Sequence, residues 1–169
     1  MRRLAIAAAL LAAPAAAATP EERLAAAGFT LPEPTRPIAT YVTSVETGNL
    51  LFLSGHGECG PNRTTGKVGK DLTVEQARAA AQRTGLCMLA TMKAALGELS
   101  RVKRVVRVLG FVNATPEFTQ HPAVINGFSD LMVTAFGESG KAARSAVGAP
   151  SLPLGIAVEI EATVEIAPR

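Results

Sequence analysis

The segment ARSAVGAPSLPLGIAVEIEATVEI, residues 143–166, has the clearest strand pattern of this chain. Its second half alternates apolar and polar residues with a period of two, which is typical of a strand with one buried face. Arg144 precedes this strand, and Glu159 and Glu161 lie within it. If the two strands of the segment form a short-loop hairpin, Arg144 and Glu159 can face each other. Such a pair is either a structural Arg–Glu ion pair or a site that holds a small carboxylate and a water molecule.

The residues before this segment predict further strands and two helices. Asn49 follows Gly48 between two strand-like runs, which indicates a hairpin, and Thr73 with Gln76 has the spacing of a helix capping box. The expected elements are a hairpin within residues 38–56, a helix over 73–97, a strand over 101–113, a helix over 123–137, and strands over 143–149 and 155–166.

This order, ββαβαββ, predicts an α+β domain with a single sheet. Right-handed crossover connections place both helices on the same face of that sheet. The opposite face then carries the glutamates of the last strand, together with apolar residues from the run LLFL at 50–53. A mixed apolar and charged face of this kind is best covered by another subunit, so we expect a homo-oligomer with carboxylates near its interfaces.

The first 18 residues read as a secretory signal peptide. Two arginines are followed by an apolar run over residues 4–17, which is too short to span a membrane, and by the small residues Ala16–Ala18. We therefore expect cleavage before Thr19 and a periplasmic or secreted protein, by either the general or the twin-arginine route. Residues 19–37 are expected to form an N-terminal extension and residues 38–169 the domain.

The composition argues against a nucleic-acid partner. The chain has 17 Lys and Arg against 14 Asp and Glu, and removal of the two signal arginines leaves 15 against 14. A near-neutral domain with 4% aromatic residues and no Trp lacks the basic patch and stacking platform of such proteins. After signal cleavage, no apolar run is long enough to predict membrane attachment.

Three motif types are present only in fragmentary form. The glycines of GHGECG match a dinucleotide fingerprint, but Pro61 and a loop separate them from the next helix, so we expect no cofactor. His56, Cys59, Cys87 and His121 lack the spacing of a metal site, and none is expected. Two cysteines do not define a disulfide framework, so their pairing stays open.

The chain resembles the Rid (YjgF) family of reactive intermediate deaminases over residues 38–166. The likeness lies in ARSAVGAPSLPLGIAVEIEA, in the hairpin YVTSVETGNLLFLSGH and in the helix VINGFSDLMVTAFG. The long connection SGHGECGPNRTTGKVGKDLT is similar to a less-studied branch of that family. The resemblance implies a chorismate-mutase-like fold and a homotrimer with sites between its subunits.

The same resemblance implies roles for individual residues. The position of Arg144 binds the substrate carboxylate, that of Glu159 positions the attacking water, and that of Tyr41 orients the substrate. Gly55, Asn126 and Ala146 would shape the pocket, Ala146 standing where well-known members often have cysteine.

These roles imply hydrolytic deamination of 2-imino or enamine acids to 2-keto acids and ammonia. The chemistry needs no metal or cofactor, because the imine carbon is already electrophilic. The alternatives are a non-catalytic trimer that binds small carboxylates and, third, an endoribonuclease.

Overall fold

The computed structural model describes residues 17–34, 36–37 and 39–168, so the predicted signal at residues 1–18 lies almost wholly outside the described residues. The helices and strands are α1 (Pro20–Ala26), β1 (Ser44–Thr47), β2 (Leu50–His56), α2 (Val74–Leu96), β3 (Val102–Asn113), α3 (His121–Phe136), β4 (Ala143–Ala149) and β5 (Val158–Ile166). Three short 3-10 turns are η1 (Leu99–Arg101), η2 (Gly137–Gly140) and η3 (Pro153–Gly155).

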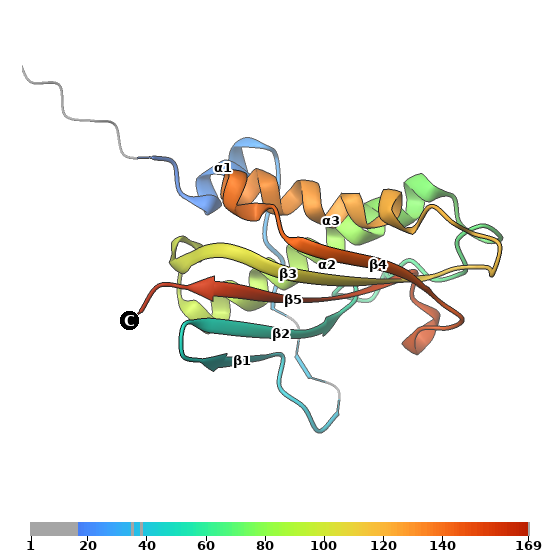
Figure 1. Cartoon of the computed structure of the whole chain (residues 1–169), viewed down its shortest axis with the longest axis horizontal. Coiled ribbons are helices and arrows are strands. Elements are labelled where there is room, and N and C mark those ends of the chain that lie inside the picture. The colour runs from blue at the N-terminus through green and yellow to red at the C-terminus, as the bar shows by residue number, and fades with distance from the viewer. Residues whose placement is uncertain (1–16, 35, 38, 169) are drawn as a thin grey trace, which may run out of the picture.

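The five strands form one mixed sheet in the order β1-β2-β5-β3-β4 (Figure 1). Strands β3 and β4 are parallel, with α3 as their crossover, and the other neighbouring strands are antiparallel. The α+β class and the predicted ββαβαββ order are confirmed, with α1 preceding them. The hairpin expected between the last two strands is wrong, because β3 lies between β4 and β5.

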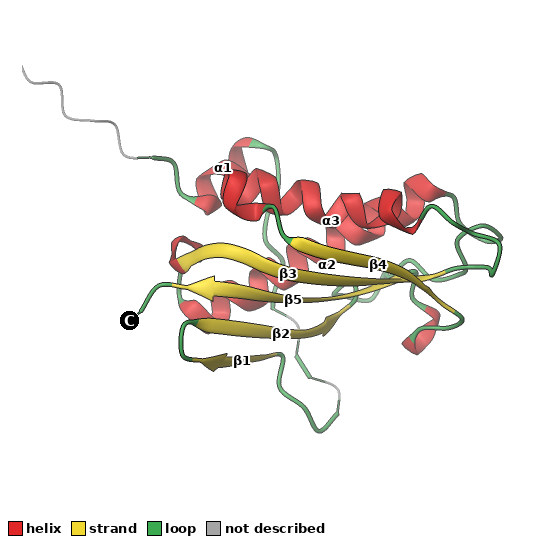
Figure 2. Ribbon diagram, in the orientation of Figure 1, coloured by secondary structure: helices red, strands yellow, loops and turns green. Residues whose placement is uncertain are grey.

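Helices α2 and α3 lie side by side on one face of the sheet (Figure 2). Helix α2 begins with the predicted capping box, in which Gln76 N–H donates to Thr73 Oγ1 at 3.2 Å and Thr73 N–H donates to Gln76 Oε1 at 2.8 Å. Helix α3 begins at His121, two residues before the expected start. The two helices approach closely at Gly127, where a Cβ would lie 2.0 Å from the Arg78 carbonyl oxygen.

Residues 19–37, expected as an extension, contain helix α1. Thr19 and Glu22 form a second capping box at its start, and Leu24 is buried in the core at 2% exposure. The Glu21 carboxylate accepts a hydrogen bond of 3.0 Å from Leu99 N–H, which ties α1 to the turn η1. Helix α1 also contacts α3, so this segment packs against the helical layer.

The predicted alternation of β5 is confirmed. Its apolar side chains, Val158, Ile160, Ala162, Val164 and Ile166, are buried under the helices. The glutamates of β5 lie on the opposite face, which none of the described helices covers (Figure 2).

This open face also exposes large apolar side chains, of which Phe52 belongs to the run LLFL. Val45, Phe52 and Val147 are 52%, 43% and 41% exposed, and strand register places all three on the face of Glu159 and Thr163. A surface that mixes these side chains with charges is typical of an interaction face. None of the described helices combines the length and the apolarity that crossing a membrane requires.

Candidate functional site

A cleft of about 510 Å³ opens at the end of β2. Three segments line it: Arg36, Ala39 and Tyr41 before β1, residues within 54–63 at the end of β2 and in the following loop, and residues within 153–159 from η3 into β5. The volume lies within the range of small-molecule sites. Of the residues whose roles the family resemblance implies, Tyr41, Gly55 and Glu159 line this cleft, and so does His56.

Glu159 is an ionisable group of the cleft whose pKa is shifted by its surroundings. Its side chain is half-buried on β5, and burial, followed by repulsion from Glu161, raises the pKa of the Glu159 carboxyl group. A Cβ on Gly55 would lie 2.2 Å from Glu159 Oε1. The carboxylate can therefore lie against β2 only because residue 55 has no side chain. A carboxylate with a raised pKa is a better proton acceptor than an ordinary glutamate.

Tyr41 reaches the cleft from the segment before β1. Ser54 on β2 holds this segment, because its hydroxyl donates a hydrogen bond of 2.6 Å to the Val42 carbonyl oxygen and its N–H donates one of 3.1 Å to Thr43. Tyr41 is 41% exposed, which leaves the side chain accessible to a ligand.

Arg144, Asn126 and Ala146 form a second group at β4 and α3. One guanidinium nitrogen, Nη1 of Arg144, donates to Asn126 Oδ1 and to Ser129 Oγ, both at 2.9 Å. Ala146 is on the same face of β4, packed against the core. Sequence reasoning identified Arg144 and Asn126 but missed Ser129, which is one turn of α3 after Asn126 and is therefore found once the helix is assigned.

The two groups lie on opposite faces of the sheet. In the strand register, Arg144 is beside Val108 of β3, which is buried under the helices, whereas Glu159 is beside Phe111, three residues further along β3. Side chains three residues apart on a strand point to opposite faces. The expectation that Arg144 and Glu159 face each other in one hairpin is therefore wrong for a single chain.

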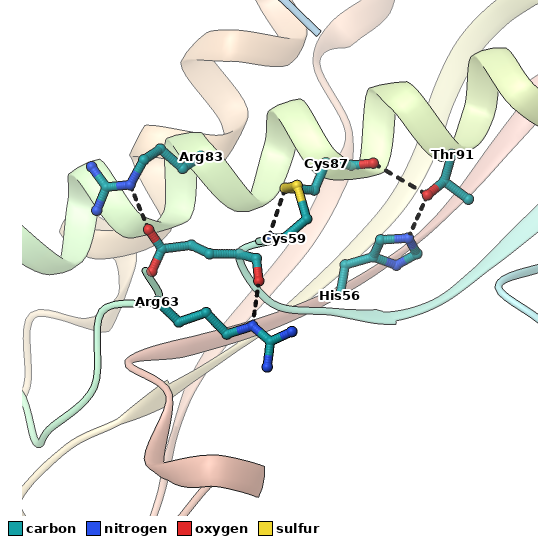
Figure 3. Close-up of a disulfide and its surroundings, with 7 residues drawn as sticks. His56, Cys59, Arg63, Arg83, Cys87 and Thr91 are labelled. Carbon is teal, nitrogen blue, oxygen red and sulfur yellow. Dashed lines mark hydrogen bonds and ion pairs between the residues drawn. A yellow bond between two sulfur atoms is a disulfide. The ribbon is translucent and has the colours of Figure 1, made fainter. Parts of the chain in front are cut away.

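The last residue of β2 and the loop after it are tied to α2 at three points (Figure 3). Cys59 and Cys87 form a disulfide, a pairing that the sequence left open. The buried Glu58 carboxylate pairs with Arg83 of α2 and accepts a hydrogen bond of 2.7 Å from Thr64 N–H. His56 contacts Thr91 Oγ1 at 3.0 Å through Nε2.

The same contacts engage His56 and both cysteines, which were considered above as metal ligands. His56 Nδ1 lies 2.6 Å from the Ser54 carbonyl oxygen, and burial lowers the pKa of the imidazole, which favours a neutral ring that donates its proton to Ser54. Both sulfurs are in the disulfide, and His121 packs edge-on against Phe118. Among the described residues no cluster of potential metal ligands is found.

Two arginines in the cleft were missed by sequence reasoning. Arg36 and Arg63 line it with Glu159. Arg63 occurs four residues after Cys59, so a firm disulfide assignment would have indicated that this arginine is held near the end of β2.

Comparison with known proteins gives matches over most of the chain. Residues 21–164 match the family described as "YjgF/chorismate mutase-like, putative endoribonuclease". The chain is 44% identical over 146 residues to Protein TCP17 of Trypanosoma cruzi. This match covers 82% of the chain and 89% of that protein.

Solved structures match the same fold. The crystal structure of Atu1372 from Agrobacterium tumefaciens, a protein of unknown function, is 46% identical with a TM-score of 0.81, and the match covers 88% of this chain and 94% of that one. RidA from an Antarctic Psychrobacter species is 27% identical with a TM-score of 0.55, over 79% of this chain and 94% of that one.

Proposed function

The chain belongs to the YjgF/chorismate mutase-like family and has its chorismate-mutase-like fold, and on this premise we propose that it hydrolyses reactive 2-imino and enamine acids to 2-keto acids and ammonia. The observation that carries the proposal is Glu159, a half-buried carboxyl group of raised pKa in a cleft of about 510 Å³. The likeness to a RidA protein supports the same class of chemistry.

In the proposed reaction Glu159 acts as general base and then as general acid. The carboxylate accepts a proton from water as the water oxygen bonds to the imine carbon, and the former imine nitrogen is protonated. The carbon–nitrogen bond then breaks, ammonia leaves, and the hydroxyl group loses its proton to become the keto group. An enamine acid enters the same route after protonation at its β-carbon.

Arg144 is the proposed group for the substrate α-carboxylate. Among the described residues its only partners are Asn126 and Ser129, both bonded through Nη1, so Nε and Nη2 remain as donors for a carboxylate. Because Arg144 and Glu159 of one chain lie on opposite sheet faces, we propose that Arg144 of one subunit completes the cleft of another.

A homotrimer with sites between subunits is the assembly that we propose. The open sheet face supports it, because Val45, Phe52 and Val147 are exposed there beside charged side chains. In β3 and β5, Arg104 is the register partner of Glu165, so both signs of charge occur on this face and identical copies can complement each other.

Export to the periplasm or the cell exterior is part of the proposal. The charged, apolar and small-residue pattern of residues 1–18 favours it. The Cys59–Cys87 disulfide gives independent support, because such bonds persist in oxidising compartments.

The test is imine hydrolysis by the oligomeric protein. An amino-acid oxidase generates imines in the assay, semicarbazide competes for them, and keto-acid release is compared between wild type, Glu159→Gln and Glu161→Gln. We expect acceleration by wild type and Glu161→Gln but not by Glu159→Gln. No acceleration over a range of imines, with binding of keto acids retained, would favour the non-catalytic carboxylate binder. RNA cleavage that depends on Glu159 would instead favour the endoribonuclease named in the family description.

A further inference from the structure

The loop that carries Arg63 is fixed on the body of the protein. The Cys59–Cys87 disulfide joins it to α2, and the Glu58 carboxylate bonds both Arg83 of α2 and the Thr64 N–H. Arg63 lies between these attached residues. Its backbone is therefore held by contacts on both sides, as a preorganised binding residue requires.

The Arg63 guanidinium is anchored at one end and has donors free at the other. Its Nε donates a hydrogen bond of 2.9 Å to the Glu58 carbonyl oxygen. Figure 3 shows this guanidinium turned away from α2, on the other side of the loop from Arg83. No carboxylate of the described residues forms an ion pair with Arg63. The carboxylate of the neighbouring Glu58 pairs with Arg83 instead. Its two terminal nitrogens are left as a planar fork that matches a carboxylate.

The balance of charge in the cleft also favours a ligand with more than one negative charge. Arg36 and Arg63 both line the cleft, and neither has an ion-pair partner among the described residues. Of the two glutamates there, Glu58 is neutralised by Arg83, which leaves Glu159. A monocarboxylic acid held by Arg144 of another subunit would leave the arginines of the cleft unpaired.

We propose that Arg63 binds a second, distal carboxylate, so that the cleft selects 2-imino dicarboxylic acids, the imines of acidic amino acids. This assignment rests on the function proposed above and adds the substrate class. Arg63 is then a specificity-determining residue, which contacts the distal end of the substrate and takes no part in the proton transfers at Glu159.

The first experiment measures binding without turnover. Isothermal titration of the oligomer with 2-oxoglutarate and with 2-oxopentanoate compares two keto acids of equal chain length that differ in the distal carboxylate. We expect wild type to bind 2-oxoglutarate about tenfold more tightly, the order of effect of a hydrogen-bonded charge pair. Arg63→Ala should remove this preference and leave 2-oxopentanoate affinity unchanged, whereas Arg63→Lys should keep part of it.

Lys70→Ala is the matched control, because Lys70 is an exposed cation of the same long connection that does not line the cleft. The Lys70→Ala variant should prefer 2-oxoglutarate over 2-oxopentanoate to the same degree as wild type. Equal affinity of wild type for the two keto acids would overturn the assignment. So would an Arg63→Ala variant that loses both ligands equally, or one that dissociates on size-exclusion chromatography, since Arg63 would then be an interface residue.

A second experiment separates this inference from the proposed function. Imine hydrolysis is measured with imines from glutamate and from norvaline. Turnover of both without an Arg63-dependent preference would overturn the Arg63 assignment and leave the deaminase proposal intact. An Arg63-dependent preference in the titration with no turnover of either imine would overturn the reaction and support the dicarboxylate site.

Discussion

The carboxylate of Glu159 on β5 lies directly against Gly55 of β2, where a Cβ would be only 2.2 Å from Glu159 Oε1. The absence of a side chain at position 55 therefore sets where the carboxylate lies in the cleft. The contact involves the far end of a flexible side chain, so a larger residue at position 55 would displace the carboxylate rather than the strands.

Gly55→Ala should consequently impair hydrolysis more than stability. We expect kcat/KM for imine hydrolysis to fall by about 100-fold, a loss that a displacement of about 1 Å can cause. The melting temperature should change little, because the backbone at Gly55 does not require positive φ. An unchanged kcat/KM would show that the position of Glu159 is not critical for the reaction.

Glu159→Gln should abolish hydrolysis and stabilise the protein at neutral pH. Burial raises the pKa of Glu159 in the folded state, so the ionised carboxylate costs stability above that pKa. The cost disappears as the pH falls through the folded pKa toward the ordinary value. The gain in melting temperature of the Gln variant should therefore be present at pH 8 and shrink in acid. A gain that is the same at every pH would contradict the raised pKa.

Glu161→Gln is the comparison for the pH dependence of catalysis. Its charge contributes to the raised pKa of Glu159, so its removal should move the acid limb of the pH–rate profile to lower pH. Activity at neutral pH should remain. Movement of the limb to higher pH would contradict this coupling between the two carboxylates.

Mixed oligomers test whether Arg144 and Glu159 act from different subunits. Arg144→Ala and Glu159→Gln should each be inactive alone, because each lacks one half of every site. If the halves come from different chains, random reassembly of an equal mixture restores about one quarter of the wild-type activity. Recovery of no activity, with subunit exchange verified by differently tagged chains, would show that both residues act within one chain.

Loss of the Cys59–Cys87 disulfide should destabilise the protein. The bridge spans 28 residues and restricts the unfolded chain, so its removal should cost about 2–4 kcal/mol. Urea unfolding of Cys59→Ser/Cys87→Ser against wild type measures this loss, and a reducing agent should destabilise wild type but leave the double variant unchanged. Equal midpoints for the two proteins would contradict a structural role for the bridge.

Local patterns allowed most secondary structure to be predicted from the sequence. The Thr73–Gln76 capping box marks the start of α2, and Val124, Phe128, Leu131 and Ala135, which recur at helical spacing, are buried on α3. These signals work because helix and strand periodicities act over a few residues. Helix α1 was not predicted, because its seven residues are too short to show a repeat.

The candidate site was predicted as a set of residues but not as an arrangement. Tyr41, Gly55 and Glu159 meet in the cleft, whereas Arg144, Asn126 and Ala146 gather at β4 and α3. The contributions of Arg63 and of the disulfide depend on a loop without periodic pattern, so no local signal placed them.

Side-chain order along the chain is enough to predict the strands, the two long helices and the apolar face of β5, because these periodicities act over a few residues. The pairing of β3 between β4 and β5 is visible only in the folded chain, since strand order depends on how the α3 crossover returns the chain to the sheet. That single choice puts Arg144 and Glu159 on opposite faces and makes the second copy of the chain part of the proposed site.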